Sequence, residues 1–187
     1  MRFLVIAVLL LFVSPLQAKE IAGVMVQEVV KTDTGAELVL NGAGIRSKFF
    51  FDIYIAELYM EFPATSVDEI IAATGSRRMV MYFLYKEVSK DKLVDGWVEG
   101  FSGNSASEDV TTLQARIDSF NAMFEDVKKG DRIVLDFVPG TGTIVTVANE
   151  EKGVIEGKDF NDALLLIWLG EKPVNKKLKK QLLSYAG

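Results

Sequence analysis

The sequence has no histidine and no cysteine among its 187 residues. Without them the chain has no Ser-His-Asp triad, no cysteine nucleophile and no imidazole base. Zinc, copper and haem sites that depend on imidazole or thiolate ligands are excluded as well. Any catalysis would have to rest on carboxylates, lysine, arginine, tyrosine, serine or threonine, and we expect no cofactor.

Positive charge is also in the minority, with 21 Lys and Arg residues against 26 Asp and Glu residues and a net charge of -5. An acidic chain argues against non-specific binding to nucleic acid, so we expect no nucleic-acid partner. Because the chain forms no disulfide, its stability must come from packing.

A long apolar run occurs at the N-terminus, where Arg2 precedes 11 apolar residues from Phe3 to Val13. The run is followed by Ser14-Pro15-Leu16-Gln17-Ala18, which ends in a small residue, as secretory signal peptides do. It is shorter than the ~20 residues that span a membrane, which disfavours an uncleaved anchor. We therefore predict a signal peptide over residues 1–18, cleavage after Ala18, and a periplasmic or secreted protein without stable membrane insertion. The mature domain would be residues 19–187.

Runs of strands and runs of helices follow one another along this domain, which predicts an α+β fold: an antiparallel sheet with a layer of helices packed on one face. Ser66 and Glu69 form a capping-box pattern at the start of a short helix. We expect Asp159 to cap a later helix and Gly170 to end it. The expected strands are 22–30, 36–40, 45–60, 78–85, 132–138 and 143–149, and the expected helices are 67–74, 90–101, 108–127, 160–169 and 174–185.

Arg46 stands out at the start of the long strand, just after Gly42-Ala43-Gly44, which we interpret as a turn. The strand from Ile45 to Met60 is apolar on nearly every residue, so both of its faces should be covered. A charge in such a strand needs a partner, which is either a protein carboxylate or an anionic ligand.

The Gly42-x-Gly44-x-Arg46 pattern and the strand that ends in Ala56-Glu57-Leu58-Tyr59 resemble the chalcone isomerase-like family. The resemblance extends over roughly residues 22 to 185 and suggests the exported bacterial members, with an open-faced sandwich fold. Two later segments also resemble that family: the hairpin 136–143, and the closing helices from Gly157-Lys158-Asp159-Phe160 to Pro173.

The resemblance implies that Arg46 faces a ligand cleft. In plant isomerases the arginine of this turn helps to hold the flavonoid, and in the fatty-acid-binding relatives it meets the ligand carboxylate. Tyr54 is expected to line the same cleft, although eight residues of straight strand would separate it from Arg46 by ~26 Å. The two side chains would then lie at opposite ends of a slot.

The catalytic residues of the isomerases do not carry over to this sequence. The catalytic threonine falls near Tyr54, and the tyrosine and asparagine of the plant helix align approximately with Leu93 and Gly100. Neither of these can donate a hydrogen bond from its side chain to an oxyanion. We therefore assign no catalytic residue.

The sequence thus favours an exported, non-catalytic protein that binds a small apolar or amphipathic, fatty-acid-like or carboxylate-bearing ligand between sheet and helices. Two alternatives remain open. One is an intramolecular isomerase or lyase with a rebuilt site. The other is a protein-interaction module whose cleft is filled by Phe49-Phe50-Phe51 and the aromatic strand 78–85. The ligand and any protein partner are not specified by the sequence.

Overall fold

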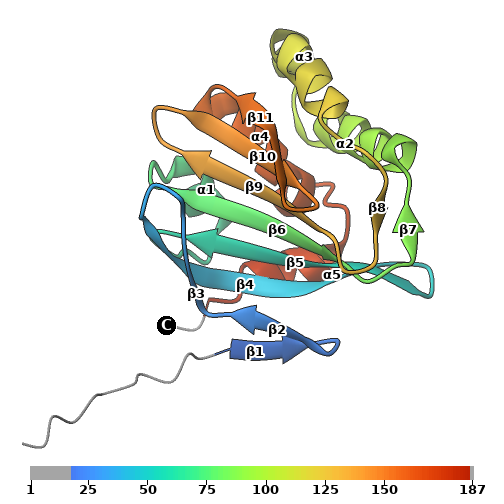
Figure 1. Ribbon diagram of the computed structural model, residues 1–187. Helices are drawn as coiled ribbons and strands as arrows, with labels where there is room; N and C mark the ends of the chain where they lie inside the picture. The colour runs from blue at the N-terminus through green and yellow to red at the C-terminus, as the bar shows by residue number, and fades with distance from the viewer. Residues whose placement is uncertain (1–17, 186–187) are drawn as a thin grey trace, which may run out of the picture.

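The computed structural model describes residues 18–185, which are built around a curled seven-stranded sheet (Figure 1). The strand order is β11-β10-β9-β6-β5-β4-β3, and every pairing in this sheet is antiparallel. The two longest strands, β4 (Glu37–Lys48) and β5 (Phe51–Met60), are neighbours. The other five are β3 (Val29–Lys31), β6 (Arg77–Phe83), β9 (Arg132–Val138), β10 (Gly142–Val147) and β11 (Glu150–Ile155).

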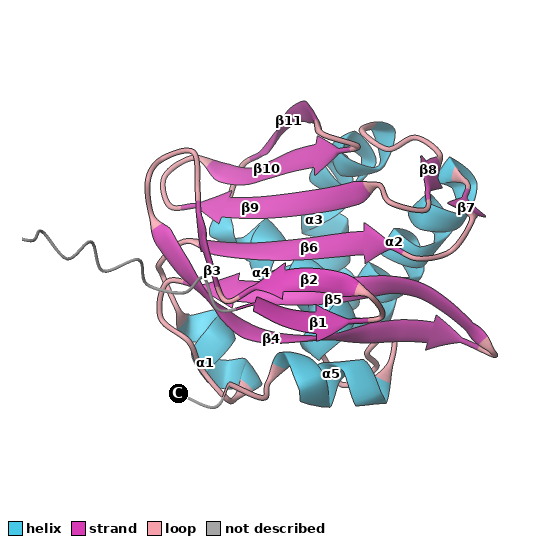
Figure 2. Ribbon diagram, turned by 60° about the horizontal axis from the view of Figure 1, so that its bottom comes forward, coloured by secondary structure: helices cyan, strands magenta, loops and turns pink. Residues whose placement is uncertain are grey.

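The helices cover one face of the sheet, as predicted, so the α+β assignment is confirmed (Figure 2). Alternate residues of β5, namely Ala56, Leu58 and Met60, pack into the same core cluster as the buried faces of the helices. At the centre of this core the rings of Phe120 and Phe124 lie 4.8 Å apart, edge to face. The helices are α1 (Val67–Ala72), α2 (Lys90–Asn104), α3 (Ser107–Ala122), α4 (Lys158–Leu169) and α5 (Lys176–Leu182).

A hairpin of β1 (Ala18–Ile21) and β2 (Val24–Gln27) lies in front of the opposite face of the sheet (Figure 2). There Val26 packs against Ala43 and Ile55, so the β4–β5 pair is covered on both faces, as its apolar sequence indicates. The single strand predicted over 22–30 is wrong: Ala22 and Gly23, which both have positive φ, form the turn of the β1–β2 hairpin, and a bend at Glu28 separates β2 from β3, which belongs to the large sheet. Of the predicted signal peptide, residues 1–17 lie outside the described part of the chain.

The predicted glycine turn at 42–44 is also wrong, because Gly42 and Gly44 lie within β4. Their role is to let α5 approach the strand. A Cβ on Gly42 would lie 2.2 Å from the backbone oxygen of Gln181, and a Cβ on Gly44 would lie 2.2 Å from Oε1 of the same residue. Close approach of two backbones is a common reason for glycine inside a strand.

The chain instead reverses at Phe49 and Phe50, between the paired residues Lys48 and Phe51. Phe49 has a φ of 55°, and the Phe49 and Phe50 side chains are 87% and 99% exposed. The segment predicted as one strand over 45–60 is therefore a β-hairpin. In the filled-cleft alternative these phenylalanines would occupy the cleft, but Phe50 lines neither cavity, and Phe49 borders the outer one while remaining almost fully exposed.

Helix ends follow local sequence only in part. The Ser66–Glu69 capping box is present at α1. The predicted cap at Asp159 is wrong: α4 follows Gly157, and the carboxylate of Asp159 accepts two hydrogen bonds from Arg116, at 2.8 and 2.6 Å. The helix predicted to reach Val127 ends at Ala122, because Val127 pairs with Val88 in a small sheet of β7 (Glu87–Val88) and β8 (Val127–Lys128).

No helix within residues 18–185 is long and apolar enough to cross a membrane.

Candidate functional site

Arg46 and Tyr54 are direct cross-strand partners in the β4–β5 pair. The guanidinium carbon of Arg46 lies 5.6 Å from the centroid of the Tyr54 ring. The distance of ~26 Å expected for a single straight strand is wrong because the turn at Phe49 and Phe50 folds the two side chains together. They can therefore meet the same end of one ligand.

The positive charge of Arg46 is not neutralised by the protein. Its side chain is half-buried, and among residues 18–185 no carboxylate lies within salt-bridge distance of its guanidinium. Three other arginines of the chain are each paired with an aspartate: Arg77 with Asp162, Arg78 with Asp136 and Arg116 with Asp159. Arg46 therefore forms no salt bridge with a carboxylate in the described part of the chain. Its guanidinium lines a cavity instead, where two of its N–H groups can donate to one carboxylate.

Tyr54 is buried and presents a neutral phenol. Its Oη accepts a hydrogen bond from Nε1 of Trp168 at 2.9 Å. Burial raises the pKa of the phenol above its usual 10.0, and the nearby charge of Arg46 and the Trp168 hydrogen bond oppose this only partly. The hydroxyl therefore keeps its proton at neutral pH and can donate it to a ligand.

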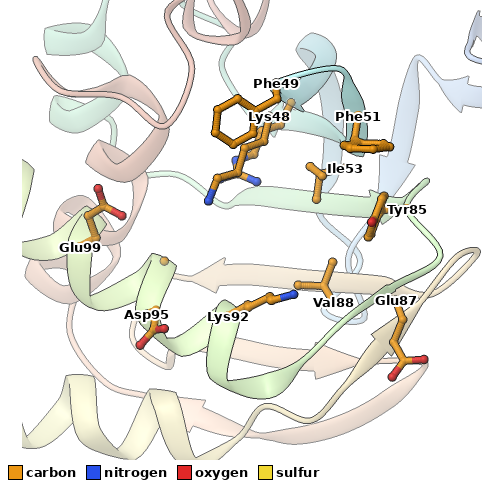
Figure 3. Close-up of a pocket in the computed structure, with 12 residues that line it drawn as sticks. Lys48, Phe49, Phe51, Ile53, Tyr85, Glu87, Val88, Lys92, Asp95 and Glu99 are labelled. Carbon is orange, nitrogen blue, oxygen red and sulfur yellow. The ribbon is translucent and has the colours of Figure 1, made fainter.

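Two adjoining cavities with shared lining residues lie at the boundary between the β4–β5 hairpin and α2, and Figure 3 shows the lining of the outer one. The outer cavity has a volume of about 380 Å³ and the inner one about 60 Å³. Arg46 and Ile53 line both of them. Figure 3 shows the Phe51 and Tyr85 rings together at one side of the outer cavity, with their centroids 5.5 Å apart.

The charge of the cavity lining changes with depth. The outer cavity is lined by the cationic residues Arg46, Lys48 and Lys92, and also by acidic ones, namely Glu87, Asp95 and Glu99. The inner cavity is lined by Arg46 and Lys92, and none of the described residues around it is acidic. The deep end of the cleft therefore favours a negatively charged group, while the entrance is balanced in charge.

Apolar and aromatic side chains close the inner end of the cleft. Leu93, at the position aligned with a catalytic tyrosine, lines the inner cavity. Gly100, aligned with a catalytic asparagine, packs against Ile167, whose carbon atoms would lie 2.8 Å from an added Cβ. These two positions supply no side-chain donor to the cleft, so the isomerase arrangement is not assembled from them.

Trp97 and Lys92 line the inner cavity and were not predicted as site residues. Trp97 also packs in the core against Trp168, with ring centroids 5.8 Å apart. Its buried Nε1 has no hydrogen-bond partner within the described structure. Both residues lie on the first turns of α2, and only the tertiary fold places those turns opposite the β4–β5 hairpin.

The described residues contain no group of three or more potential metal-ligating side chains. The titratable groups at the inner cavity are Arg46, Tyr54 and Lys92. They are suited to hydrogen bonding and charge pairing with an oxyanion or a carboxylate.

Sheet, helices and cleft together define an α+β open-faced sandwich with a cavity at the sheet–helix boundary. The chain belongs to the chalcone isomerase-like family, whose model matches residues 18–184. Among solved structures, it resembles a fatty-acid-binding protein of Arabidopsis thaliana with a TM-score of 0.60 and 15% sequence identity. The alignment covers 83% of this chain and 96% of that protein. At this identity the likeness demonstrates a shared fold. No curated protein matches the sequence.

Proposed function

We propose that this protein binds, without catalysing its conversion, an amphipathic ligand that carries one carboxylate, as fatty acids do. The observation that carries the proposal is the unpaired guanidinium of Arg46 beside the neutral phenol of Tyr54 at the deep end of a partly apolar cleft. A guanidinium binds a carboxylate through two parallel hydrogen bonds, and the phenol can add a third.

The ligand's carboxylate would lie where the two cavities meet, and its chain would extend outward. The inner cavity, at about 60 Å³, is too small for a long chain because Leu93 and Trp97 close it. The outer cavity, at about 380 Å³, falls within the ~300–1,000 Å³ typical of small-molecule sites. Phe51, Ile53 and Val88 would contact the chain along it.

The structural neighbour supports this ligand class, since that Arabidopsis protein is a fatty-acid-binding protein of the same fold. The exposed positions of Phe49 and Phe50 support an open cleft over a cleft filled by the protein's own side chains. The missing donors at Leu93 and Gly100 favour binding over an isomerase or lyase reaction, so we expect no turnover of chalcone-like substrates.

Export is part of the proposal. Cleavage after Ala18 would leave Lys19 as the first residue of the mature chain, inside β1. The N-terminal sequence of the protein recovered from the periplasm or medium tests this directly, because a chain that begins at Met1 there would refute the predicted cleavage.

Binding can be tested with Arg46→Ala and palmitate as the probe, using calorimetry on the mature protein. Loss of a charge-assisted hydrogen-bond pair should weaken the affinity roughly tenfold to a hundredfold. Arg132→Ala is a matched control, because Arg132 also stacks over a tyrosine, Tyr82 at 5.3 Å, but on the other face of the sheet. Equal affinities of the two variants, or no binding by the unmodified protein, would refute the proposal.

A further inference from the structure

The tip of the β4–β5 hairpin presents two phenylalanines to solvent. Phe49 is 87% exposed and Phe50 is 99% exposed, and Phe51 next to them is 55% exposed. The hairpin extends beyond the end of the neighbouring strands, so the tip projects from the body of the molecule (Figure 2). Exposed aromatic side chains that project together are typical of a contact surface.

This turn is unfavourable for the isolated chain. Two-residue hairpin turns prefer asparagine and glycine, because one or both central residues need positive φ. Phe49 adopts a φ of 55°, which is unfavourable for a bulky residue. Its side chain gains little packing in return, since it is almost fully exposed. An external contact accounts for phenylalanine at both positions.

The shape of the tip favours a lipid surface over a protein partner. Two side chains at the end of a narrow hairpin cannot supply the ~800 Å² that each partner buries in a typical protein interface. The same two side chains can each enter the acyl boundary of a bilayer, where the burial of a phenylalanine is favourable. Lys48, which precedes the turn and is exposed, can keep its amine at the lipid phosphates.

The tip is also part of the cleft, because Phe49, Phe51 and Lys48 line the outer cavity (Figure 3). A membrane that receives the tip would therefore lie at the entrance through which a lipid chain enters or leaves. The entrance is balanced in charge, so we attribute the contact mainly to the aromatic side chains and only secondarily to anionic lipid.

We propose that Phe49 and Phe50 insert into the outer layer of a phospholipid membrane and place the mouth of the cleft against the acyl chains. This is a peripheral contact through one hairpin. The docking itself needs no ligand, whereas its use in ligand transfer rests on the proposed function.

Flotation of the mature protein with phosphatidylcholine vesicles tests the docking. Asparagine tolerates the positive φ of position 49 and glycine is unrestricted at position 50, so Phe49→Asn/Phe50→Gly should fold at least as stably, as thermal unfolding will show. We expect it to lose vesicle partitioning by tenfold or more, as the burial energy of two phenylalanines implies. Phe62→Ser is the matched control: Phe62 is 66% exposed but follows the far end of β5, and its replacement should leave partitioning unchanged.

The docking proposal is overturned if the unmodified protein does not float, or if the Asn-Gly variant floats equally well. It is also overturned if the tip instead holds two copies together, which sedimentation without vesicles would reveal as self-association lost in the variant. Arg46→Ala separates the two proposals, because it should still float while failing to bind palmitate. Phe50→Gly alone, at a residue that lines neither cavity, should bind palmitate in solution but take it up from vesicles more slowly.

Discussion

The guanidinium of Arg46 lies over the ring of its cross-strand partner Tyr54, at 5.6 Å, and no described carboxylate pairs with it. Because the phenol of Tyr54 is fixed by Trp168, the pair presents charge and hydrogen-bond donor in a preset geometry. A preorganised site loses less conformational entropy when a ligand binds.

Tyr54→Phe should weaken palmitate binding about fivefold to tenfold, because it removes one donor but leaves the ring under Arg46. It should also lower the free energy of unfolding by about 1–3 kcal/mol, since the buried Nε1 of Trp168 loses its acceptor. Calorimetry and urea unfolding measure the two effects. Tyr82→Phe, which alters the equivalent ring under Arg132, should change binding little.

Ligand binding should be independent of pH from about 6 to 9. Arginine stays protonated throughout this range, and burial raises the pKa of Tyr54, so its phenol remains neutral. Affinity for palmitate should fall only in acid, as the ligand carboxylate becomes protonated near its ordinary pKa of about 4–5. A loss of affinity between pH 7 and 9 would contradict the assignment of Tyr54 as a donor.

Gly42→Ala should destabilise the fold more than Gly44→Ala. The added Cβ at Gly42 meets the backbone of α5, whereas at Gly44 it meets the movable side chain of Gln181. We expect costs of about 3 and about 1 kcal/mol in urea unfolding, within the range for overpacked sites. Gly103→Ala on α2, where an added Cβ has no neighbour within 4 Å, should instead stabilise by about 0.5–1 kcal/mol.

Glu57 should make the protein less stable as pH rises above the ordinary pKa of a glutamate. Its side chain is buried on the β1–β2 side of the sheet, Oε2 accepts a hydrogen bond from Tyr59, and Oε1 has no partner within the described structure. Burial raises the pKa of Glu57 above 4.5, opposed by the Tyr59 hydrogen bond and the charge of Arg132.

The folded state therefore holds the Glu57 proton more tightly than the unfolded state does. The contribution of protonated Glu57 to stability is complete below the pKa that Glu57 has in the unfolded chain. This contribution is lost as pH rises through the higher pKa of Glu57 in the folded protein. Glu57→Gln should remove this decline from the dependence of unfolding free energy on pH. Glu99→Gln, an exposed carboxylate on α2, should leave the decline in place. A Glu57→Gln profile that matches the unmodified protein would show that Glu57 titrates normally.

Local sequence was sufficient for much of the fold. The Ser66–Glu69 capping box and the hairpin turn before Gly142 both lie where the sequence predicts them, because their hydrogen bonds connect near neighbours in the chain. The glycines of β4 were misassigned because the reason for them lies in α5, about 140 residues away. The turn at Phe49 was missed because it contains neither glycine nor asparagine.

The sequence singled out Arg46 and Tyr54 but did not predict how they lie relative to each other or to the helices. Arg46 stood out as a lone charge in an apolar segment, and that signal is local. Its closeness to Tyr54 depends on the unpredicted turn, and the presence of Lys92 and Trp97 depends on how α2 docks. The positions of Tyr54, Lys92 and Trp97 relative to Arg46 are thus set by the tertiary structure, and no periodicity in the sequence specifies them.

The dependence of β4 on α5 also sets an order of assembly. Asn41 Nδ2 donates to the carbonyl of Leu182, 141 residues away, and the glycines beside Asn41 are covered by the same final helix. A chain that emerges from its N-terminus, from a ribosome or across a membrane, lacks this helical cover for the strand until α5 has emerged. Contacts of such long range form late and slowly. The strand that carries Arg46 is therefore completed only after α5 has been made, and a chain shortened before Lys176 would expose its glycine face to proteases.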